Sequence, residues 1–260
     1  MGWWNGAAGL GVGLLVGLTG VGGGALMTPI LVLLFGVAPA TAVGTDLWFA
    51  AITKLAGVAV QHRQGRVDWP VVRRLALGSL PASVLTLLWL QRAGMQQIKQ
   101  GLTLDALGAV LLLTALALVF KKHTHALGDA LRTRAPVPFK RAQPGLTVLA
   151  GALLGGLVTL TSIGAGALGA VLLLALYPRR MTPAVLVGTD IVHAIPLTLV
   201  AGTGHLLMGH VDWRLLANLL LGSIPGVLLG SVLGDKVAEH WLRLAIAAVL
   251  VGVGAKLLAT

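Results

Sequence analysis

Three ionisable residues, Asp46, Lys54 and Asp190, lie inside long apolar stretches of this sequence, where they could do chemistry. Asp46 follows Thr45 and Asp190 follows Thr189, each pair preceded by a glycine. A carboxylate in apolar surroundings is costly, which suggests a function such as taking up and releasing a proton. Capping of a helix N-terminus by the Thr or the Asp is the alternative, and it explains either aspartate equally well.

Lys54 and His193 are the other residues placed to act on a charged ligand. A lysine facing a cavity can pair with an anion or with Asp46, eight positions earlier on a neighbouring helix face. Alternatively, its long side chain reaches a membrane interface near Gln61. His193, three residues after Asp190, either titrates and donates to an anion or is a hydrogen-bonded packing residue.

Two clusters of glycine and hydroxyl residues interrupt long apolar runs. The first has four glycines in five positions, which lowers helix propensity, so a helix should break there. Backbone N–H groups at the start of a half-helix, with nearby hydroxyls, can bind an anion. Close helix packing is the alternative role of the glycines. The predicted anion-binding residues are Thr19, Gly20, Gly22, Gly23, Gly24, Thr161, Ser162, Gly164 and Gly166, together with Thr45, Thr189 and Lys54.

The chain repeats itself at an offset of 144 positions. The matched pairs are Gly20 and Gly164, Gly22 and Gly166, Asp46 and Asp190, Val67-Asp68-Trp69 and Val211-Asp212-Trp213, and Gly78-Ser79-Leu80-Pro81 and Gly222-Ser223-Ile224-Pro225. Lys54 is matched by Thr198, so it is not shared between the copies. The sequence therefore predicts two copies of one unit, at 1–120 and 145–260, joined by a basic linker at 121–144.

Composition places the chain in the membrane class, because 57% of its residues are hydrophobic and 10% are charged. The net charge of +11 lies mostly in short loops, as the positive-inside tendency requires. Few aromatic residues interleave with the basic ones, which argues against nucleic acid as a partner.

Enzyme chemistry finds little support in the sequence. The chain has no cysteine, so disulfides and thiolate metal sites are excluded. No Ser/His/Asp or metal-ligand spacing is present, and neither a cofactor nor a metal is expected. We interpret four other histidines as solvated side chains of the linker and of a loop; they are His123, His125, His205 and His210.

The apolar runs predict the helical segments. Uninterrupted runs at about 40–61, 71–90, 102–120, 183–208, 215–233 and 241–258 are near the ~20 residues that a spanning helix needs. Glycine-broken runs at about 7–35 and 146–177 open each copy. If a broken run spans, each copy has four crossings and the copies are parallel. If it is a re-entrant hairpin, each copy has three and the copies are inverted.

Loop charges distinguish these two arrangements. With Lys54 set aside, the inverted arrangement places fourteen Lys and Arg residues inside and four outside, whereas the parallel arrangement places twelve inside and six outside. The positive-inside tendency therefore favours inversion. Both arrangements put the linker in the cytoplasm, so we predict a multi-pass protein of the plasma (inner) membrane.

The glycine-rich opening resembles that of a known family. The run from Gly17 to Gly24, followed by Met27-Thr28-Pro29 and by two Gly-Thr-Asp elements in a duplicated plan, is similar to the TauE/SafE family of membrane transporters. The resemblance covers nearly the whole chain. It implies the export or movement of sulfite and small organosulfur anions such as sulfoacetate.

These observations predict an all-α integral membrane protein of two homologous, inverted repeats of about four helical segments each. We expect a secondary transporter of small anions, in the class of sulfite, thiosulfate or an organosulfonate, working by alternating access at a site between the repeats. Asp46, Asp190 and His193 are the candidates for proton coupling, with capping as the alternative. An anion channel and a membrane scaffold are the alternative functions. The expected partners are the anion, a coupling proton, the lipid bilayer and, as an open question, a second copy of the chain.

Overall fold

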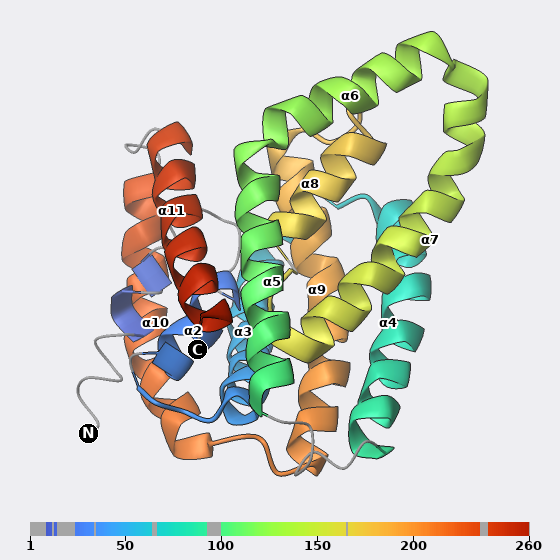
Figure 1. Cartoon of the computed structure of the whole chain (residues 1–260). Coiled ribbons are helices and arrows are strands. Elements are labelled where there is room, and N and C mark those ends of the chain that lie inside the picture. Colours follow the sequence, from blue (N-terminus) through green and yellow to red (C-terminus); the bar gives the residue numbers. More distant parts are fainter. Residues whose placement is uncertain are drawn as a thin grey trace.

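The computed structural model describes residues 9–11, 13–14, 24–33, 35–63, 67–92, 100–164, 166–234 and 239–259. Within these ranges the regular structure is helical, with no β-strand. Figure 1 shows the helices gathered in one bundle, with α6 (Lys121–Arg134) and the start of α7 (Pro136–Thr161) projecting beyond its upper end. The prediction of an all-α protein is confirmed for the described residues.

The first half of the chain forms helices close to the predicted segments. They are α2 (Gly24–Leu33), α3 (Pro39–Arg63), α4 (Trp69–Arg92) and α5 (Gln100–Val119). The bounds of α3, α4 and α5 differ from the predicted ones by no more than two residues. Gly36, with φ of 63°, makes the turn that separates α2 from α3. Pro39 then begins α3, because its fixed φ suits the first turn of a helix.

The basic linker is helical. It consists of α6 and the first turns of α7, which meet at Ala135, a residue with non-helical φ of −138° and ψ of 67°. Pro136 begins α7, which continues without interruption into the apolar run of the second half. The linker at 121–144 therefore shares α7 with the second copy.

The second half of the chain is also helical. After α7 come α8 (Ala167–Leu176), α9 (Pro183–Leu207), α10 (Trp213–Gly234) and α11 (Glu239–Leu258). Thr182 caps α9, since its side chain accepts a hydrogen bond from the N–H of Val185 at 3.4 Å. The start of α9 is thus set by a Thr-Pro pair, the usual signal for a helix N-terminus.

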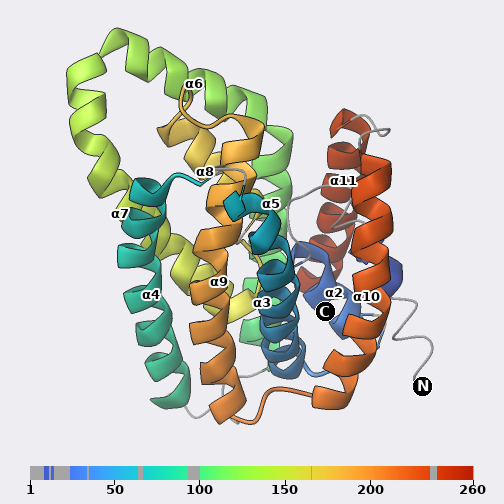
Figure 2. The ribbon, with the colours of Figure 1, turned by 180° about the vertical axis from the view of Figure 1, so that it is seen from behind.

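Helices from the two halves lie side by side. α3 packs against α9, α4 against α7, and α5 against α11. Figures 1 and 2 show that α3 and α9 run in opposite directions through the centre of the bundle, and that α5 and α11 also run in opposite directions. Helices α4 and α10 lie on opposite flanks and likewise run in opposite directions.

Small residues bring α4 and α7 into close contact. A Cβ atom on Gly151 would lie 2.2 Å from the carbonyl oxygen of Leu75, and one on Gly155 would lie 2.3 Å from that of Ser79. The two glycines are four positions apart and share a helix face, the small-residue spacing that lets membrane helices approach closely. A larger side chain at either position would push the helices apart.

The surface of the bundle is that of a membrane protein. Leucines point outward along the long helices, with Leu77 68% exposed and Leu207 83% exposed. By length and composition, three of the described helices can cross a membrane, namely α4, α7 and α9, or four if α5 and α6, bent by 65°, are one span. The chain is therefore built to cross the membrane several times.

Candidate functional site

Two buried carboxylates face the centre of the bundle, one on α3 and one on α9. Asp46 is fully buried and Asp190 is 6% exposed. Each is the eighth residue of its helix, so neither caps the helix that carries it. The interpretation of these residues as N-terminal caps is therefore wrong for α3 and α9. Their cost of burial has to be met by other groups.

Lys54 lies between the two carboxylates. Its Nζ is 3.9 Å from Asp190 Oδ2, and the lysine is only 6% exposed. Its ammonium also interacts electrostatically with Asp46. The alternative that Lys54 extends to the membrane interface is thus wrong: a buried ammonium requires ionic partners, and the bundle supplies two.

Each carboxylate also lies beside one of the two short helices, α2 or α8. The Thr28 hydroxyl, in α2, donates to Asp46 Oδ2 at 2.6 Å. Gly169, in the first turn of α8, lies so close to Asp190 that a Cβ atom there would be 2.6 Å from Oδ1. Gly169 is the third residue of α8, and because the N-terminal turn of a helix favours negative charge, this position suits a carboxylate.

The break predicted in the second copy is present. α7 ends at Thr161, and α8 begins at Ala167. Between them Ser162 has φ of 59°, and Gly164 and Gly166 have φ of 122° and 149°. Glycine adopts such positive φ values freely, whereas other residues do so rarely.

The hydroxyls at this break differ in their bonding. Thr161 Oγ1 donates to the carbonyl of Leu157 at 2.7 Å and accepts from the N–H of Ile163 at 3.2 Å, so it holds the end of α7. Ser162 Oγ is buried beside the Asp46 carboxylate and interacts with it, although the two do not meet in good hydrogen-bond geometry. In the first copy, Gly24 begins α2, while Thr19, Gly20, Gly22 and Gly23 lie outside the described residues.

His193 lies one turn after Asp190 on the same helix and is 1% exposed. Its Nε2 is 2.9 Å from Ser79 Oγ on α4, and its Nδ1 has no hydrogen-bond partner. His193 is therefore hydrogen-bonded and packed between helices, which is one of the two roles considered from the sequence, and its second ring nitrogen is without a partner. We name Asp46, Lys54, Ser162, Asp190 and His193 the central polar cluster.

Unpartnered polar atoms concentrate in this cluster. Buried polar groups in proteins are nearly always hydrogen-bonded, so each exception requires a reason. Among the described residues, seven buried side-chain atoms lack a hydrogen-bond partner. Four belong to the central polar cluster, and they are Asp46 Oδ1, Ser162 Oγ, Asp190 Oδ1 and His193 Nδ1. Such a concentration indicates a place for a polar ligand or ion.

Thr45 and Thr189 contact other elements instead of the cluster. Thr45 Oγ1 accepts from the backbone N–H of Asp212 at 3.1 Å, and Thr189 Oγ1 accepts from that of Asp68 at 3.0 Å. Asp212 in turn accepts from the N–H of Leu215 at 3.0 Å, at the start of α10. Each threonine thus fixes the loop that leads into a helix of the other half.

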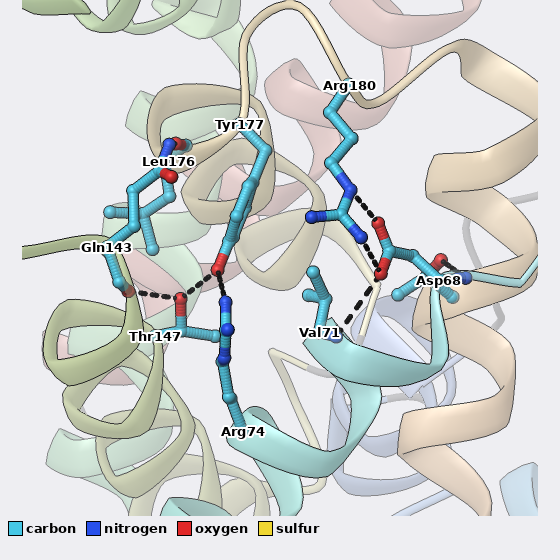
Figure 3. A network of polar contacts seen from close by, with 9 residues as sticks. Asp68, Val71, Arg74, Gln143, Thr147, Leu176, Tyr177 and Arg180 are labelled. Carbon is cyan, nitrogen blue, oxygen red and sulfur yellow. Dashed lines mark hydrogen bonds and ion pairs between the residues drawn. The ribbon is translucent and has the colours of Figure 1, made fainter. Parts of the chain in front are cut away.

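The loop before α4 is held by a charged network that the sequence analysis missed. Arg180 contacts the Asp68 carboxylate through two nitrogens, with Nη2 2.7 Å from Oδ1. Figure 3 shows this pair beside a second set of contacts, in which the Tyr177 hydroxyl is 2.8 Å from Thr147 Oγ1 and accepts from Arg74 at 3.2 Å. These residues stand at separate places in the sequence, and no spacing signal links them.

The opposite end of the bundle is built differently. There His205 is 3% exposed, and its Nε2 is 2.9 Å from the carbonyl oxygen of Thr159. The prediction of a solvated His205 is therefore wrong. The rings of His205 and His210 are 5.7 Å apart, and partial burial lowers the pKa of His210. Within the described part of the chain, no ion pair holds Asp212 as Arg180 holds Asp68.

Comparisons with known proteins agree on one family. A family model described as "Sulfite exporter TauE/SafE" matches residues 6–257. The chain is 43% identical over 255 residues to the "Probable membrane transporter protein YjnA" of Bacillus subtilis (strain 168), covering 96% of this chain and 97% of that protein. It is 28% identical over 245 residues to the "Probable membrane transporter protein YdhB" of the same organism, covering 90% of this chain and 91% of that protein. No solved structure gives a significant match.

Proposed function

Because the chain belongs to the TauE/SafE family of membrane transporters and is not an enzyme, we propose that it is a secondary transporter that carries a small sulfur oxyanion through the central polar cluster. One observation carries this proposal: a buried cation, Lys54, lies between the halves of the chain and is surrounded by unpartnered polar atoms. An anion needs a desolvated positive charge with donors around it, and of the four unpartnered atoms Ser162 Oγ and His193 Nδ1 are the ones able to donate. Sulfite, thiosulfate and organosulfonates, the substrate class suggested by the family, have this need.

The proposed binding groups are the cation and the glycine breaks. Lys54 supplies the charge, and Ser162 supplies a buried hydroxyl beside Asp46. The backbones around Gly164 and Gly166, with Thr161, complete the half-site in the second copy. Their counterparts, Thr19, Gly20 and Gly22 to Gly24, are proposed for the first copy.

Equivalent contacts at the two ends of the bundle support inverted repeats. Thr45 and Asp212 form one cross-contact, while Thr189 and Asp68 form the other, and both partners shift by 144 positions between the two. Figure 1 places the start of α4 near the upper end and the start of α10 at the lower end, as inversion requires. A membrane protein with this symmetry can expose a central site alternately to either side.

Helix packing gives a second pair of equivalent contacts. Gly151 and Gly155 of α7 approach the carbonyls of Leu75 and Ser79 on α4. A Cβ atom on Gly9 would lie 2.4 Å from the carbonyl of Leu219, and one on Gly13 would lie 2.4 Å from that of Ser223. Leu219 and Ser223 are 144 positions after Leu75 and Ser79, whereas Gly151 and Gly155 are 142 positions after Gly9 and Gly13, so the two packings are alike without matching residue for residue.

Basic residues support a cytoplasmic linker. The upper end of the bundle in Figure 1 carries α6, the start of α7 and the loop between α8 and α9, with ten basic residues if the start of α4 is included. They are Arg73, Arg74, Lys121, Lys122, Arg132, Arg134, Lys140, Arg141, Arg179 and Arg180. If the protein lies in the plasma membrane, the positive-inside tendency favours a cytoplasmic location for this end of the bundle.

Uptake into liposomes tests the proposal. Purified protein is reconstituted, and uptake of sulfite, thiosulfate, sulfoacetate and chloride is measured with and without a pH gradient. We expect saturable uptake of a sulfur oxyanion, and Lys54→Gln should lower it by about 30-fold or more, the effect of removing one member of a buried charge pair. The matched control is Lys140→Gln, an exposed linker lysine, which should transport like the wild type.

Two outcomes would contradict the transporter. Flux that does not saturate and follows only the electrochemical gradient of the anion would indicate a channel. Folded protein that moves none of the four anions, by comparison with empty liposomes, would indicate a scaffold or a different substrate class.

A further inference from the structure

The charges of the central polar cluster constrain how an anion can enter it. The cluster contains one buried ammonium, Lys54, and two buried carboxylates, Asp46 and Asp190. With both carboxylates ionised its net charge is minus one. An additional anion beside Lys54 would meet two like charges in surroundings of low dielectric, where repulsion is strong. The cluster must therefore lose negative charge when the anion binds.

The groups facing the cluster leave few ways to lose it. His193 is the other titratable side chain, and its Nε2 is already engaged with Ser79 of α4. Neighbouring elements contribute Thr28 from α2 and Ser162 from the break after α7, and neither titrates in this range. The described charged residues of α5, α7 and α10 are exposed, namely Asp105, Lys140, Arg141 and Arg214.

The two carboxylates are not equivalent. Asp46 Oδ2 accepts the hydroxyl of Thr28 at 2.6 Å, which ties it to α2. Asp190 has its Oδ2 3.9 Å from Lys54 Nζ and its Oδ1 without a hydrogen-bond partner. Asp190 therefore depends on Lys54 for compensation of its charge, and a competing anion would remove that compensation.

We propose that the transported anion replaces Asp190 beside Lys54, that Asp190 takes up one proton in the same step, and that anion and proton cross the membrane together. This rests on the proposed transport function and assigns its coupling residue. The O–H bond forms on Asp190 with a proton from the water on the open side, and it breaks again when the anion leaves on the other side. The net charge of the cluster is minus one before and after a monoanion binds.

A stoichiometry follows from this charge balance. A monoanion moves with one proton, so its transport is electrically neutral. A dianion requires a second proton, for which Asp46 is the remaining carboxylate of the cluster. Accumulation of a monoanion should then rise about tenfold for each unit of pH difference, because one unit of pH corresponds to a tenfold ratio at equilibrium.

The test uses methanesulfonate, a monoanion that stays ionised from pH 5 to pH 8, so that pH acts on the protein alone. Reconstituted full-length protein is assayed for accumulation driven by an inward proton gradient and for exchange of labelled against unlabelled anion at equal pH. We expect wild-type protein to accumulate the anion with the pH gradient, whether or not a potassium diffusion potential is imposed.

In Asp190→Asn the pH gradient should no longer drive accumulation, so the ratio of anion inside to anion outside should fall below that of the wild type by about tenfold for each unit of pH difference. It should still exchange anion, at a rate that no longer depends on pH. The control is Asp105→Asn, an exposed carboxylate on α5, which should behave as wild type in both assays.

Two results would overturn the inference while leaving transport intact. One is accumulation by wild-type protein that follows the membrane potential and ignores pH, and the other is wild-type accumulation by Asp190→Asn. The wild-type measurement decides the matter even where a variant does not fold. Wild-type protein that neither accumulates nor exchanges any tested anion would instead contradict the transport function itself.

Discussion

Single residues of the central site are placed by contacts that reach across the bundle. Lys54 pairs with Asp190, 136 positions later. It also interacts with Asp46 on its own helix, but Asp190 is the carboxylate that we propose the anion displaces. Gly169 approaches Asp190 from the other side. The position of one carboxylate is therefore set by α3 and α8 together, and a change in either should alter transport without changing the charge.

Gly169→Ala tests this placement. Its Cβ would lie 2.6 Å from Asp190 Oδ1, so the carboxylate must move relative to Lys54. We expect several-fold slower anion uptake with a loss of stability of about 1 kcal/mol or less, since a side-chain end can shift. The control is Gly145→Ala, where nothing lies within 4 Å. Equal uptake by both variants would show that this contact does not position Asp190.

The Tyr177 hydroxyl is the second residue-scale test. It lies 2.8 Å from Thr147 Oγ1 and accepts from Arg74, and Tyr177 is 2% exposed. Tyr177→Phe removes both contacts and leaves the ring in place, so we expect a loss of about 1 kcal/mol in the free energy of unfolding. Thermal denaturation in detergent measures it. An unchanged transition would mean that Thr147 and Arg74 find other partners.

Among the elements, the break between α7 and α8 decides where backbone groups are free. Gly166 has φ of 149°, which a residue with a side chain adopts only with strain. Gly166→Ala should cost about 1–3 kcal/mol in stability and should lower uptake, because the half-site loses its geometry. The control, Gly252→Ala, lies on α11 with nothing within 4 Å. Wild-type stability of Gly166→Ala would exclude strain at this position.

Helix α6 is attached to the loop after α8 by a pH-sensitive contact. Arg179 donates to Asp129 at 2.7 Å, and this hydrogen bond lowers the pKa of Asp129 below its ordinary value. The carboxylate is ionised above that pKa, so the contact is present at neutral pH and is lost as the pH falls through the lowered value.

Hydrogen exchange measures this attachment. In wild-type protein, exchange in α6 should increase only below about pH 4, the ordinary range of an aspartate. Asp129→Asn should show the faster exchange already at pH 7, with transport unchanged because the site is exposed and far from the cluster. Identical exchange in both proteins at pH 7 would show that the pair does not hold α6.

At the scale of the whole molecule, the proposed inverted arrangement predicts which loops face which side. Figure 1 places the start of α7 toward the upper end and the start of α10 at the lower end. Lys140 is the fifth residue of α7, and Arg214 is the second residue of α10. The chain contains no cysteine, so single cysteines can report on each side. Lys140→Cys should react with a membrane-impermeant maleimide only after the cells are opened, and Arg214→Cys in intact cells. Labelling of both from the same side would contradict the inversion.

The sequence by itself determined the helices, the membrane class, the break in the second half and the family. These follow from local properties: apolar runs of sufficient length, prolines at helix starts and glycines where φ is positive. The same reasoning left open whether Lys54 paired or extended outward, because both outcomes fit one helix taken alone.

The tertiary structure decided the partners. It brought Lys54 to Asp190 and Thr28 to Asp46, and it buried His205 against Thr159. It also placed the hydroxyls of Thr45 and Thr189 where they bond the loops before α10 and α4. The reason is that a side chain in a bundle meets whichever helix packs against its face. Which helix that is depends on the crossing of α3 with α9 and of α4 with α7, and no local pattern in the sequence records it.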